Sequence, residues 1–180
     1  MVYLLLGTGF EEMEALAPLD LMRRAHIDVQ TVGISGSVVT GSHGIGIAAD
    51  ISLEQMDLTA LDMIVLPGGL GGVASARACQ PALDALRFAY ENDKYVAAIC
   101  AGPTVLADLG ITDGKKATCY PGCEDGMGQA VMIPNAPCIR DDKLITGTSA
   151  GSAVLFGLML VEALQGKAAA DAVAQQIVIR

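Results

Sequence analysis

The stretch Val96-Ala97-Ala98-Ile99-Cys100-Ala101-Gly102-Pro103 decides how the fold of this chain is interpreted. Its four apolar residues are typical of a buried strand, and Pro103 suits the first turn of a helix. Cys100 then lies at a sharp strand-to-helix elbow, where free backbone N–H groups and a helix dipole favour the thiolate. We therefore predict that Cys100 is a nucleophile with a pKa below the ordinary value of about 8.5. The alternative is a small buried hydrophobic residue, the usual role of a free cysteine.

The rest of the chain alternates apolar runs with helical patterns. Strands are predicted at residues 2–6, 29–32, 63–66, 95–99, 116–119 and 144–146, with a short edge at 44–49 and a last strand at 177–179. Helices are predicted at residues 11–25, 81–92, 104–109, 150–164 and 168–176. Continuous apolar strands that alternate with helices indicate an α/β fold, with a mostly parallel sheet covered by helices on both faces. Because no linker or repeat divides the chain, we expect residues 1–180 to form a single domain.

Composition excludes several classes of function. The 180 residues carry a net charge of −9, whereas nucleic acids and anionic membranes bind clustered lysine and arginine. No apolar run reaches the roughly 18 residues of a membrane-spanning helix, and the first residues lack the pattern of a signal peptide. We therefore expect a cytoplasmic protein that binds neither nucleic acid nor a membrane. Five cysteines without an export signal predict free thiols, and their spacing does not match a metal site.

Four loops are expected to carry the chemistry, because ligands bind at the carboxyl ends of parallel strands. These loops follow Leu6, Leu66, Ile99 and Thr146, and each is rich in small residues. Small residues let the backbone approach a ligand closely. Candidate site residues are therefore sought in these four loops.

The first loop leads into a helix that begins with three glutamates, Glu11, Glu12 and Glu14. The preceding Gly7-Thr8-Gly9 resembles the start of a dinucleotide fingerprint, but the three carboxylates would repel a pyrophosphate there. We expect Glu11 and Glu12 to cap the helix on a solvated face. One of the three could instead point inward, where a carboxyl beside a thiolate would keep its proton and act as an acid or base.

Two further turns lie at strand ends. The Pro67-Gly68-Gly69 turn can aim backbone N–H groups at a developing oxyanion. The segment Gly147-Thr148-Ser149-Ala150-Gly151 matches a serine nucleophile elbow, but a serine hydrolase of that kind needs a later histidine. A cysteine peptidase or amidotransferase likewise needs a histidine base near its cysteine. The two histidines, His26 and His43, both lie far upstream, so the pentapeptide is interpreted as a turn and helix start.

These motifs resemble, in one order along the chain, those of the DJ-1/ThiJ/PfpI family, and most closely its DJ-1 branch. The segments that carry the resemblance are Gly9-Phe10-Glu11-Glu12-Met13-Glu14, Val65-Leu66-Pro67-Gly68-Gly69, Ala97-Ala98-Ile99-Cys100-Ala101-Gly102-Pro103 and Lys116-Ala117-Thr118-Cys119-Tyr120-Pro121. The resemblance implies a flavodoxin-like three-layer sandwich with a cysteine nucleophile elbow. It also implies a homodimer.

The resemblance assigns roles to particular residues. The reactive cysteine of the family corresponds to Cys100, and its buried glutamate corresponds to Glu14. The oxyanion amides correspond to Gly69 and Ala101, with Gly68 beside them.

The chain also departs from the family pattern. Many relatives have a histidine at the position of Tyr120, so a cysteine–histidine dyad is absent and the peptidase interpretation is weakened. Tyr120 remains a candidate hydrogen-bond donor, with packing as its alternative role. In a dimer, His43 and Arg24 are expected to lie near the partner's site.

Two functions follow from a reactive Cys100 beside a carboxyl. The first is cofactor-free conversion of small dicarbonyls such as methylglyoxal, as in the family's glutathione-independent glyoxalases and its protein or nucleotide deglycases. The second is a redox sensor or chaperone that acts through oxidation of Cys100 without catalysis. Both need the same thiolate, so the sequence does not separate them.

Overall fold

The computed structural model describes residues 1–179 around a seven-stranded sheet with the strand order β10-β11-β7-β6-β1-β2-β5. The strands are β1 (Val2–Leu6), β2 (Val29–Gly33), β5 (Ile51–Ser52), β6 (Met63–Leu66), β7 (Tyr95–Ile99), β10 (Cys138–Asp141) and β11 (Leu144–Gly147). All neighbouring pairs are parallel except β10 with β11, which are antiparallel. The predicted mostly parallel sheet is confirmed.

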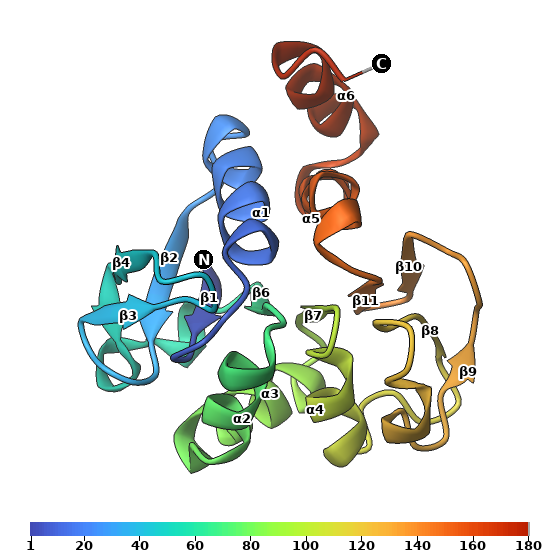
Figure 1. Cartoon of the computed structure of the whole chain (residues 1–180). Coiled ribbons are helices and arrows are strands. Elements are labelled where there is room, and N and C mark those ends of the chain that lie inside the picture. The colour runs from blue at the N-terminus through green and yellow to red at the C-terminus, as the bar shows by residue number, and fades with distance from the viewer. Residues whose placement is uncertain (180) are drawn as a thin grey trace.

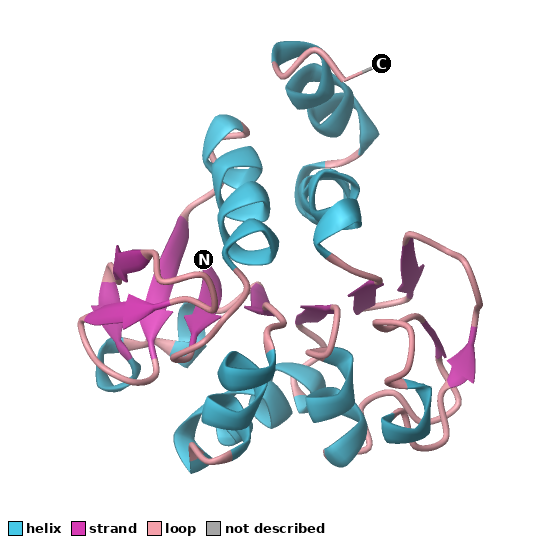
Figure 2. Ribbon diagram, viewed as in Figure 1, coloured by secondary structure: helices cyan, strands magenta, loops and turns pink. Residues whose placement is uncertain are grey.

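Helices cover both faces of this sheet (Figure 1, Figure 2). One layer holds α1 (Glu12–Arg24), α5 (Ala153–Gln165) and α6 (Lys167–Gln176). The opposite layer holds α2 (Leu70–Arg77), α3 (Gln80–Glu91) and α4 (Pro103–Asp108). The structure is therefore the predicted α/β sandwich of three layers.

The side chains of β1 show why its sequence is apolar throughout. Leu4 and Leu6 pack into the core that includes residues of α1, α5 and α6, whereas Tyr3 and Leu5 pack into the core beneath α2, α3 and α4. All four are at most 2% exposed. A strand buried on both faces cannot alternate polar and apolar residues, which is the pattern that predicted a parallel sheet.

Smaller elements flank the main sheet. A hairpin joins β3 (Val38–Thr40) to β4 (Gly46–Ala48), and β8 (Lys116–Ala117) pairs with β9 (Val131–Met132). Short 3-10 turns are η1 (Leu53–Gln55), η2 (Leu58–Ala60), η3 (Glu124–Gly126) and η4 (Ala150–Ser152). The edge predicted at residues 44–49 thus pairs with β3, apart from the seven-stranded sheet.

One predicted strand is wrong and one helix was missed. Residues 177–179 form a turn after α6 rather than a strand, because α6 lies on the helical layer with no free sheet edge beside it. The apolar Ile177 instead packs against the core next to α5. Helix α2 was not predicted, because its glycines and alanines show little helical periodicity.

The strand order places a topological switch between β1 and β6. From β1 the chain continues to β2 on one side, and it later returns to β6 on the other side. Loops on the two sides of such a point turn apart and leave a crevice at the carboxyl edge of the sheet, where ligands bind in open α/β folds. Within residues 1–179, no helix combines the length and apolar character needed to cross a bilayer.

Candidate active site

Cys100 lies at the predicted elbow between β7 and α4. Its φ is 65°, a left-handed conformation that is costly for a residue with a side chain. The neighbouring loops hold it there, because the Cys100 N–H donates to the Gly147 carbonyl at 2.9 Å and the Tyr120 N–H donates to the Cys100 carbonyl at 2.8 Å. Gly102 completes the turn, since a Cβ at that position would lie 2.8 Å from the Leu66 carbonyl oxygen. The thiol is therefore presented at the carboxyl edge of the sheet by a strained backbone.

Glu14 is the glutamate that points inward from α1. Its Oε2 accepts a hydrogen bond from the Gly68 N–H at 3.0 Å, and the Cys100 thiol and the Ala150 N–H lie close enough to lower the pKa of its carboxyl. Glu11 caps the helix, because its Oε2 accepts from the Glu14 N–H at 2.8 Å. The loops after Leu66, Ile99 and Thr146 thus meet at the Glu14 carboxyl and the Cys100 thiol. Helix α1, which follows the loop after Leu6, supplies Glu14.

Burial and mutual repulsion govern how this pair titrates. Burial raises the pKa of Glu14 to about 7, because hydrogen bonds from Cys100 and Gly68 offset only part of the desolvation cost. Burial, and then the Glu14 carboxylate, raise the pKa of Cys100 to about 12. The prediction of a lowered Cys100 pKa is therefore wrong: amides at the elbow do favour the thiolate, but they are outweighed. At neutral pH the pair keeps the thiol proton, and Glu14 is poised to accept it.

The amides of Gly69 and Ala101 act on the Cys100 thiol and lower its pKa, although burial and Glu14 raise it more. Gly69 has a φ of 85° and caps the N-terminus of α2, while Ala101 immediately precedes the turn into α4. The Gly68 amide, which was grouped with them, is directed at Glu14 instead. Gly68 must be a glycine, because a Cβ there would lie 2.6 Å from the Cys100 Cβ.

Glu12 is not on a solvated face as predicted. It is 4% exposed, and its carboxylate is bound by the loop between β3 and β4. Its Oε1 accepts from the His43 N–H at 2.8 Å, and its Oε2 lies 2.8 Å from His43 Nδ1 and 3.2 Å from Ser42 Oγ. The packing of this loop against the first turn of α1 buries the side chain, a tertiary contact that the local sequence does not reveal.

The remaining predicted residues lie farther from the thiol. The Tyr120 backbone contacts Cys100, whereas its side chain is 48% exposed. Arg24 pairs with Asp20 at the other end of α1, about 15 Å along the helix from Glu14 at about 1.5 Å per residue. His43 is 69% exposed and pairs with Glu12 of its own chain. The participation of Arg24 and His43 in a partner's site stays a prediction.

One group of side chains has the composition of a metal site. The ligating atoms of Glu11, Glu12 and His43 lie within 4.8 Å of one another. The Glu12 oxygens are already occupied by donors from the protein, and Glu11 caps α1. The cluster is therefore accounted for by contacts that fasten a loop to a helix.

Sequence reasoning missed the contribution of Ala150. The segment Gly147–Gly151 resembles a serine elbow in sequence, yet in the structure its Gly147 carbonyl accepts from the Cys100 N–H and its Ala150 amide helps to lower the pKa of Glu14. Ser152 Oγ donates to the Ser149 carbonyl at 2.8 Å and accepts from its N–H. The small residues of this segment indicate that its backbone can approach other groups closely, and that signal could have identified the contact.

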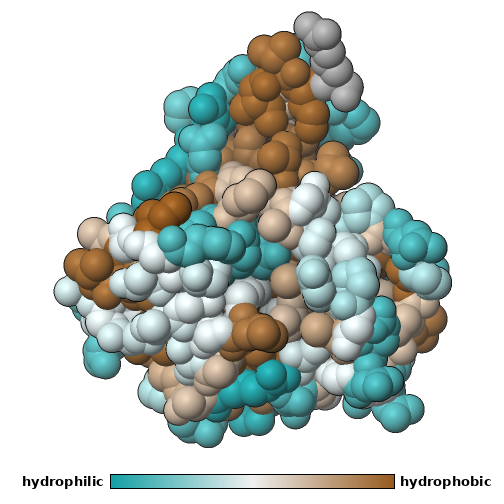
Figure 3. All heavy atoms as spheres, viewed as in Figure 1, coloured by the Kyte–Doolittle hydropathy of each residue, from teal (hydrophilic) through white to brown (hydrophobic). Residues whose placement is uncertain are grey.

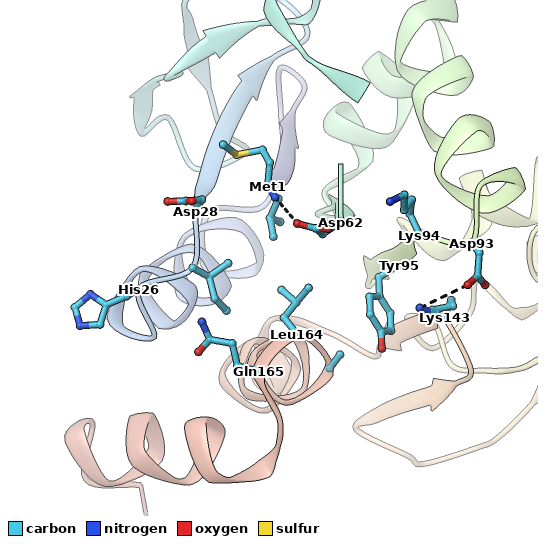
Figure 4. Close-up of a pocket in the computed structure, with 13 residues that line it drawn as sticks. Met1, His26, Asp28, Asp62, Asp93, Lys94, Tyr95, Lys143, Leu164 and Gln165 are labelled. Carbon is cyan, nitrogen blue, oxygen red and sulfur yellow. Dashed lines mark hydrogen bonds and ion pairs between the residues drawn. The ribbon is translucent and has the colours of Figure 1, made fainter. Parts of the chain in front are cut away.

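A cavity of about 520 Å³ lies at the opposite, amino edge of the sheet (Figure 4). Apolar and charged side chains line it, including Leu164, Tyr95, Lys94 and Asp28. Ion pairs Met1–Asp62 and Lys143–Asp93 lie on its wall. No cysteine is among its lining residues, so this cavity and the Cys100 thiol occupy different edges of the molecule.

Comparison with known proteins agrees with this geometry. The model of the DJ-1/PfpI family matches residues 1–163. The chain belongs to the DJ-1/PfpI family. It is 36% identical to the protein dj-1beta of Drosophila melanogaster over 177 residues, covering 97% of this chain and 95% of that protein. The crystal structure of Drosophila melanogaster DJ-1beta superposes with a TM-score of 0.94 at 35% identity, covering 99% of this chain and 97% of that one.

A more distant DJ-1/PfpI relative carries a functional name. A deglycase of Pyrococcus abyssi is 30% identical over 126 residues, which cover 70% of this chain and 75% of that protein.

Proposed function

We propose that this protein converts reactive dicarbonyls such as methylglyoxal to 2-hydroxy acids, without glutathione or a cofactor. The observation that carries the proposal is the joint placement of the Cys100 thiol, the Glu14 carboxyl and two backbone amides at the switch point of the sheet. A nucleophile, an acid/base group and oxyanion donors are the three parts that addition to an aldehyde requires.

The first step is addition of Cys100 to the aldehyde carbon. Above pH 7 the Glu14 carboxylate accepts the thiol proton as the sulfur attacks, because the pKa of Glu14 is about 7. The new C–S bond forms while the C=O π electrons move to oxygen, and the Gly69 and Ala101 amides, which act on the neighbouring thiol, would stabilise the developing oxyanion. Transfer of the proton from Glu14 to that oxygen gives a hemithioacetal.

The second step moves a hydrogen between adjacent carbons. Glu14 removes the proton from the carbon bonded to sulfur, and the electron pair shifts towards the neighbouring carbonyl oxygen to give an enediolate. The hydroxyl proton on the first carbon passes to that oxygen. Glu14 then returns the proton to the neighbouring carbon, which gives a thioester of the 2-hydroxy acid on Cys100. Water hydrolyses the thioester and restores the thiol. The sum is methylglyoxal plus one water giving lactate, so no oxidant or reductant is needed.

Early adducts of a dicarbonyl with an amine carry the same reacting carbons. Attack by Cys100 on such an adduct would release the amine and lead to the same 2-hydroxy acid. The similarity to a deglycase of Pyrococcus abyssi supports this extension to glycated proteins or nucleotides.

Lactate formation from methylglyoxal in the absence of glutathione tests the proposal. We expect Cys100→Ala to abolish turnover and Cys79→Ala, at a half-buried free cysteine in the N-cap position of α3, to retain it. Both variants remove one sulfur, so loss of activity in Cys100→Ala alone identifies the nucleophile. Full turnover in Cys100→Ala would overturn the mechanism.

A redox sensor is the second candidate, and the partial exposure of Cys100 favours it. A hydroperoxide can oxidise the thiolate to sulfenic and then sulfinic acid. A protonated Glu14 would donate a hydrogen bond to the sulfinate and hinder further oxidation. Mass spectrometry after mild peroxide treatment tests this, since oxidation spread evenly over all five cysteines would contradict it.

We also propose a homodimer formed through the face that includes the first turn of α1. Met13 is 59% exposed, and Ile45, whose amide approaches Glu12 at 3.4 Å, is 51% exposed. Leu155 of α5 is 45% exposed, and apolar side chains gather over the layer of α5 and α6 (Figure 3). Sedimentation of the wild type and of Met13→Asp tests this, with a shift from dimer to monomer expected in the variant. A monomeric wild type would refute it.

A further inference from the structure

The two amides at the Cys100 sulfur come from the starts of two different helices. Gly69 is the N-cap of α2, and Ala101 lies directly before the turn into α4. Helices α2 and α4 pack against each other in the same layer. The relative placement of these helices therefore sets where the two amides point.

A chain of hydrogen bonds connects the far end of α2 to the elbow. Arg77, the last residue of α2, donates from Nη2 to Thr104 Oγ1 at 2.8 Å and from Nε to Asp108 Oδ2 at 2.7 Å. Thr104 Oγ1 in turn donates to the Ala101 carbonyl oxygen at 2.7 Å, and the Thr104 N–H reaches the same oxygen at 3.1 Å. The guanidinium thus acts on the residue that supplies one of the amides.

The chemistry of these hydrogen bonds favours a role in positioning the elbow over a role in stabilising the fold. Arg77 and Asp108 are 42% and 53% exposed, and exposed ion pairs add little to stability. Thr104, by contrast, is 6% exposed, and its hydroxyl is both acceptor and donor. A charged donor polarises that hydroxyl and strengthens the bond it makes to Ala101.

The elbow is the place where such a constraint matters. Cys100 has a φ of 65°, and a strained residue keeps its conformation only when its surroundings hold it. Ala101 is the next residue along, and its carbonyl is the one fixed by Thr104. The Ala101 N–H and carbonyl belong to neighbouring peptide units that share the Ala101 Cα, so release of that carbonyl would free the backbone on the C-terminal side of the amide that acts on the sulfur.

We propose that Arg77 and Thr104 are positioning residues that hold the Ala101 amide, and with it the elbow, in the geometry needed for attack by Cys100. The proposal rests on the proposed function where turnover of methylglyoxal is measured. It does not rest on that function where the rate of Cys100 alkylation is measured. Charged groups that face the sulfur come from α1, namely Glu14 with Glu11 behind it, and they are untouched by changes at Arg77 or Thr104.

Matched variants test this role. Thr104→Val removes the hydroxyl at constant shape, and Thr104→Ser keeps it. Arg77→Met removes the guanidinium, and Arg87→Met is its control, because Arg87 is 47% exposed and lies 3.9 Å from Asp84 on α3. The rate of Cys100 alkylation by iodoacetamide from pH 6 to 10, followed by mass spectrometry, is measured beside turnover of methylglyoxal.

We expect Thr104→Val and Arg77→Met each to lower kcat and the alkylation rate about 10-fold, since small misplacements of catalytic groups are costly. Thr104→Ser and Arg87→Met should stay within about twofold of wild type, and the double variant should be no worse than either single one. Unchanged kcat and alkylation in Thr104→Val and Arg77→Met, with only a lower Tm, would overturn the proposal. If the wild type has no dicarbonyl activity, the proposed function fails, and the alkylation rates still decide the role of Arg77 and Thr104.

Discussion

Two regions contact the first turn of α1, the loop between β3 and β4 and the carboxyl edge of the sheet. They shift the pKa values of two buried glutamates in opposite directions. Glu12 faces the loop between β3 and β4, where donors from His43, Ile45 and Ser42 surround its carboxylate. Burial opposes its ionisation, yet these donors lower the pKa of Glu12 to about 2. Glu14 faces the sheet edge, where burial raises its pKa to about 7.

The contrast shows that burial alone does not set the charge of a side chain. Both carboxyls are at most 4% exposed, so desolvation acts on each of them. What differs is both depth and donors: Glu14 lies deeper among protein atoms and shares its site with a thiol and with Glu11, whereas Glu12 is met by an imidazole and several N–H or O–H groups. One turn of helix thus presents a permanent anion that fastens a loop and a carboxyl able to exchange a proton near neutral pH.

The largest expected difference between the two glutamates is in catalysis. Glu14→Gln should reduce kcat/KM for methylglyoxal about 1,000-fold, because it removes the acid/base group, whereas Glu12→Gln should retain turnover within a few-fold. In the wild type, kcat/KM should rise with pH through about 7 as Glu14 loses its proton. The pH profile of Glu14→Gln should lack that rise. Equal losses in both variants would remove the distinction between the two regions.

Glycines beside each carboxyl offer a second contrast. A Cβ on Gly68 would lie 2.6 Å from the Cys100 Cβ and would also contact Glu14, so Gly68→Ala should lower kcat about 100-fold. A Cβ on Gly41 would lie 2.8 Å from the Glu12 Cγ, and Gly41→Ala should instead cost about 1–3 kcal/mol of stability. Turnover and urea unfolding of both variants separate the effects. A stable, fully active Gly68→Ala protein would contradict the close packing at the site.

The stability of the two variants should depend on pH with opposite sign. The folded pKa of Glu12 lies below its ordinary value of 4.5, so its stabilisation is present above pH 4.5 and is lost as pH falls towards 2. Glu12→Gln should therefore destabilise the protein by about 2 kcal/mol at pH 7 and by much less at pH 3. The folded pKa of Glu14 is raised, so ionisation of Glu14 costs stability as pH rises from 4.5 through 7. Glu14→Gln should therefore stabilise the protein at pH 8. Urea unfolding at pH 3, 7 and 8 measures both differences.

The smallest effect is expected at His43. Its contact with Glu12 raises its pKa above 6.5, so its contribution is fully present below pH 6.5 and is lost as pH rises through the folded value. His43→Ala should lower Tm more at pH 6 than at pH 9. Scanning calorimetry at the two pH values tests this, with His26→Ala, at the exposed end of α1, as the control. An equal decrease in Tm at pH 6 and pH 9 would mean that the charge on the His43 imidazole does not stabilise the loop between β3 and β4.

Much of the fold could be predicted because the strands are buried on both faces. The predicted strands at 63–66 and 95–99 have the observed bounds of β6 and β7, since unbroken apolar runs end at turn residues. Helix α2 escaped prediction because residues 70–77 contain glycine and alanine without a clear apolar stripe. The apolar residues 177–179 were mistaken for a strand, because local composition does not tell whether a sheet edge is within reach.

The candidate site likewise has a part that the sequence could predict and a part that it could not. The elbow at Cys100 could be predicted from its neighbours, because the conformation of a turn depends on the small residues within it. The residues by themselves left open which of Glu11, Glu12 and Glu14 faces the thiol, since all three lie within one helical turn, whereas the resemblance to the family pointed to Glu14. The packing of α1 decided it, with Pro18 against Gly157 of α5 and the hairpin loop against Glu12.

Local sequence thus determined the candidate nucleophile, its turn and the parallel sheet, because each depends on residues close together in the chain. Tertiary structure decided which glutamate has a pKa near neutral, where the Gly68 amide points and in which direction the Cys100 pKa moves. Those properties depend on desolvation and on charges brought together from distant segments. Both are set by the distance between groups in space, which the folded packing establishes.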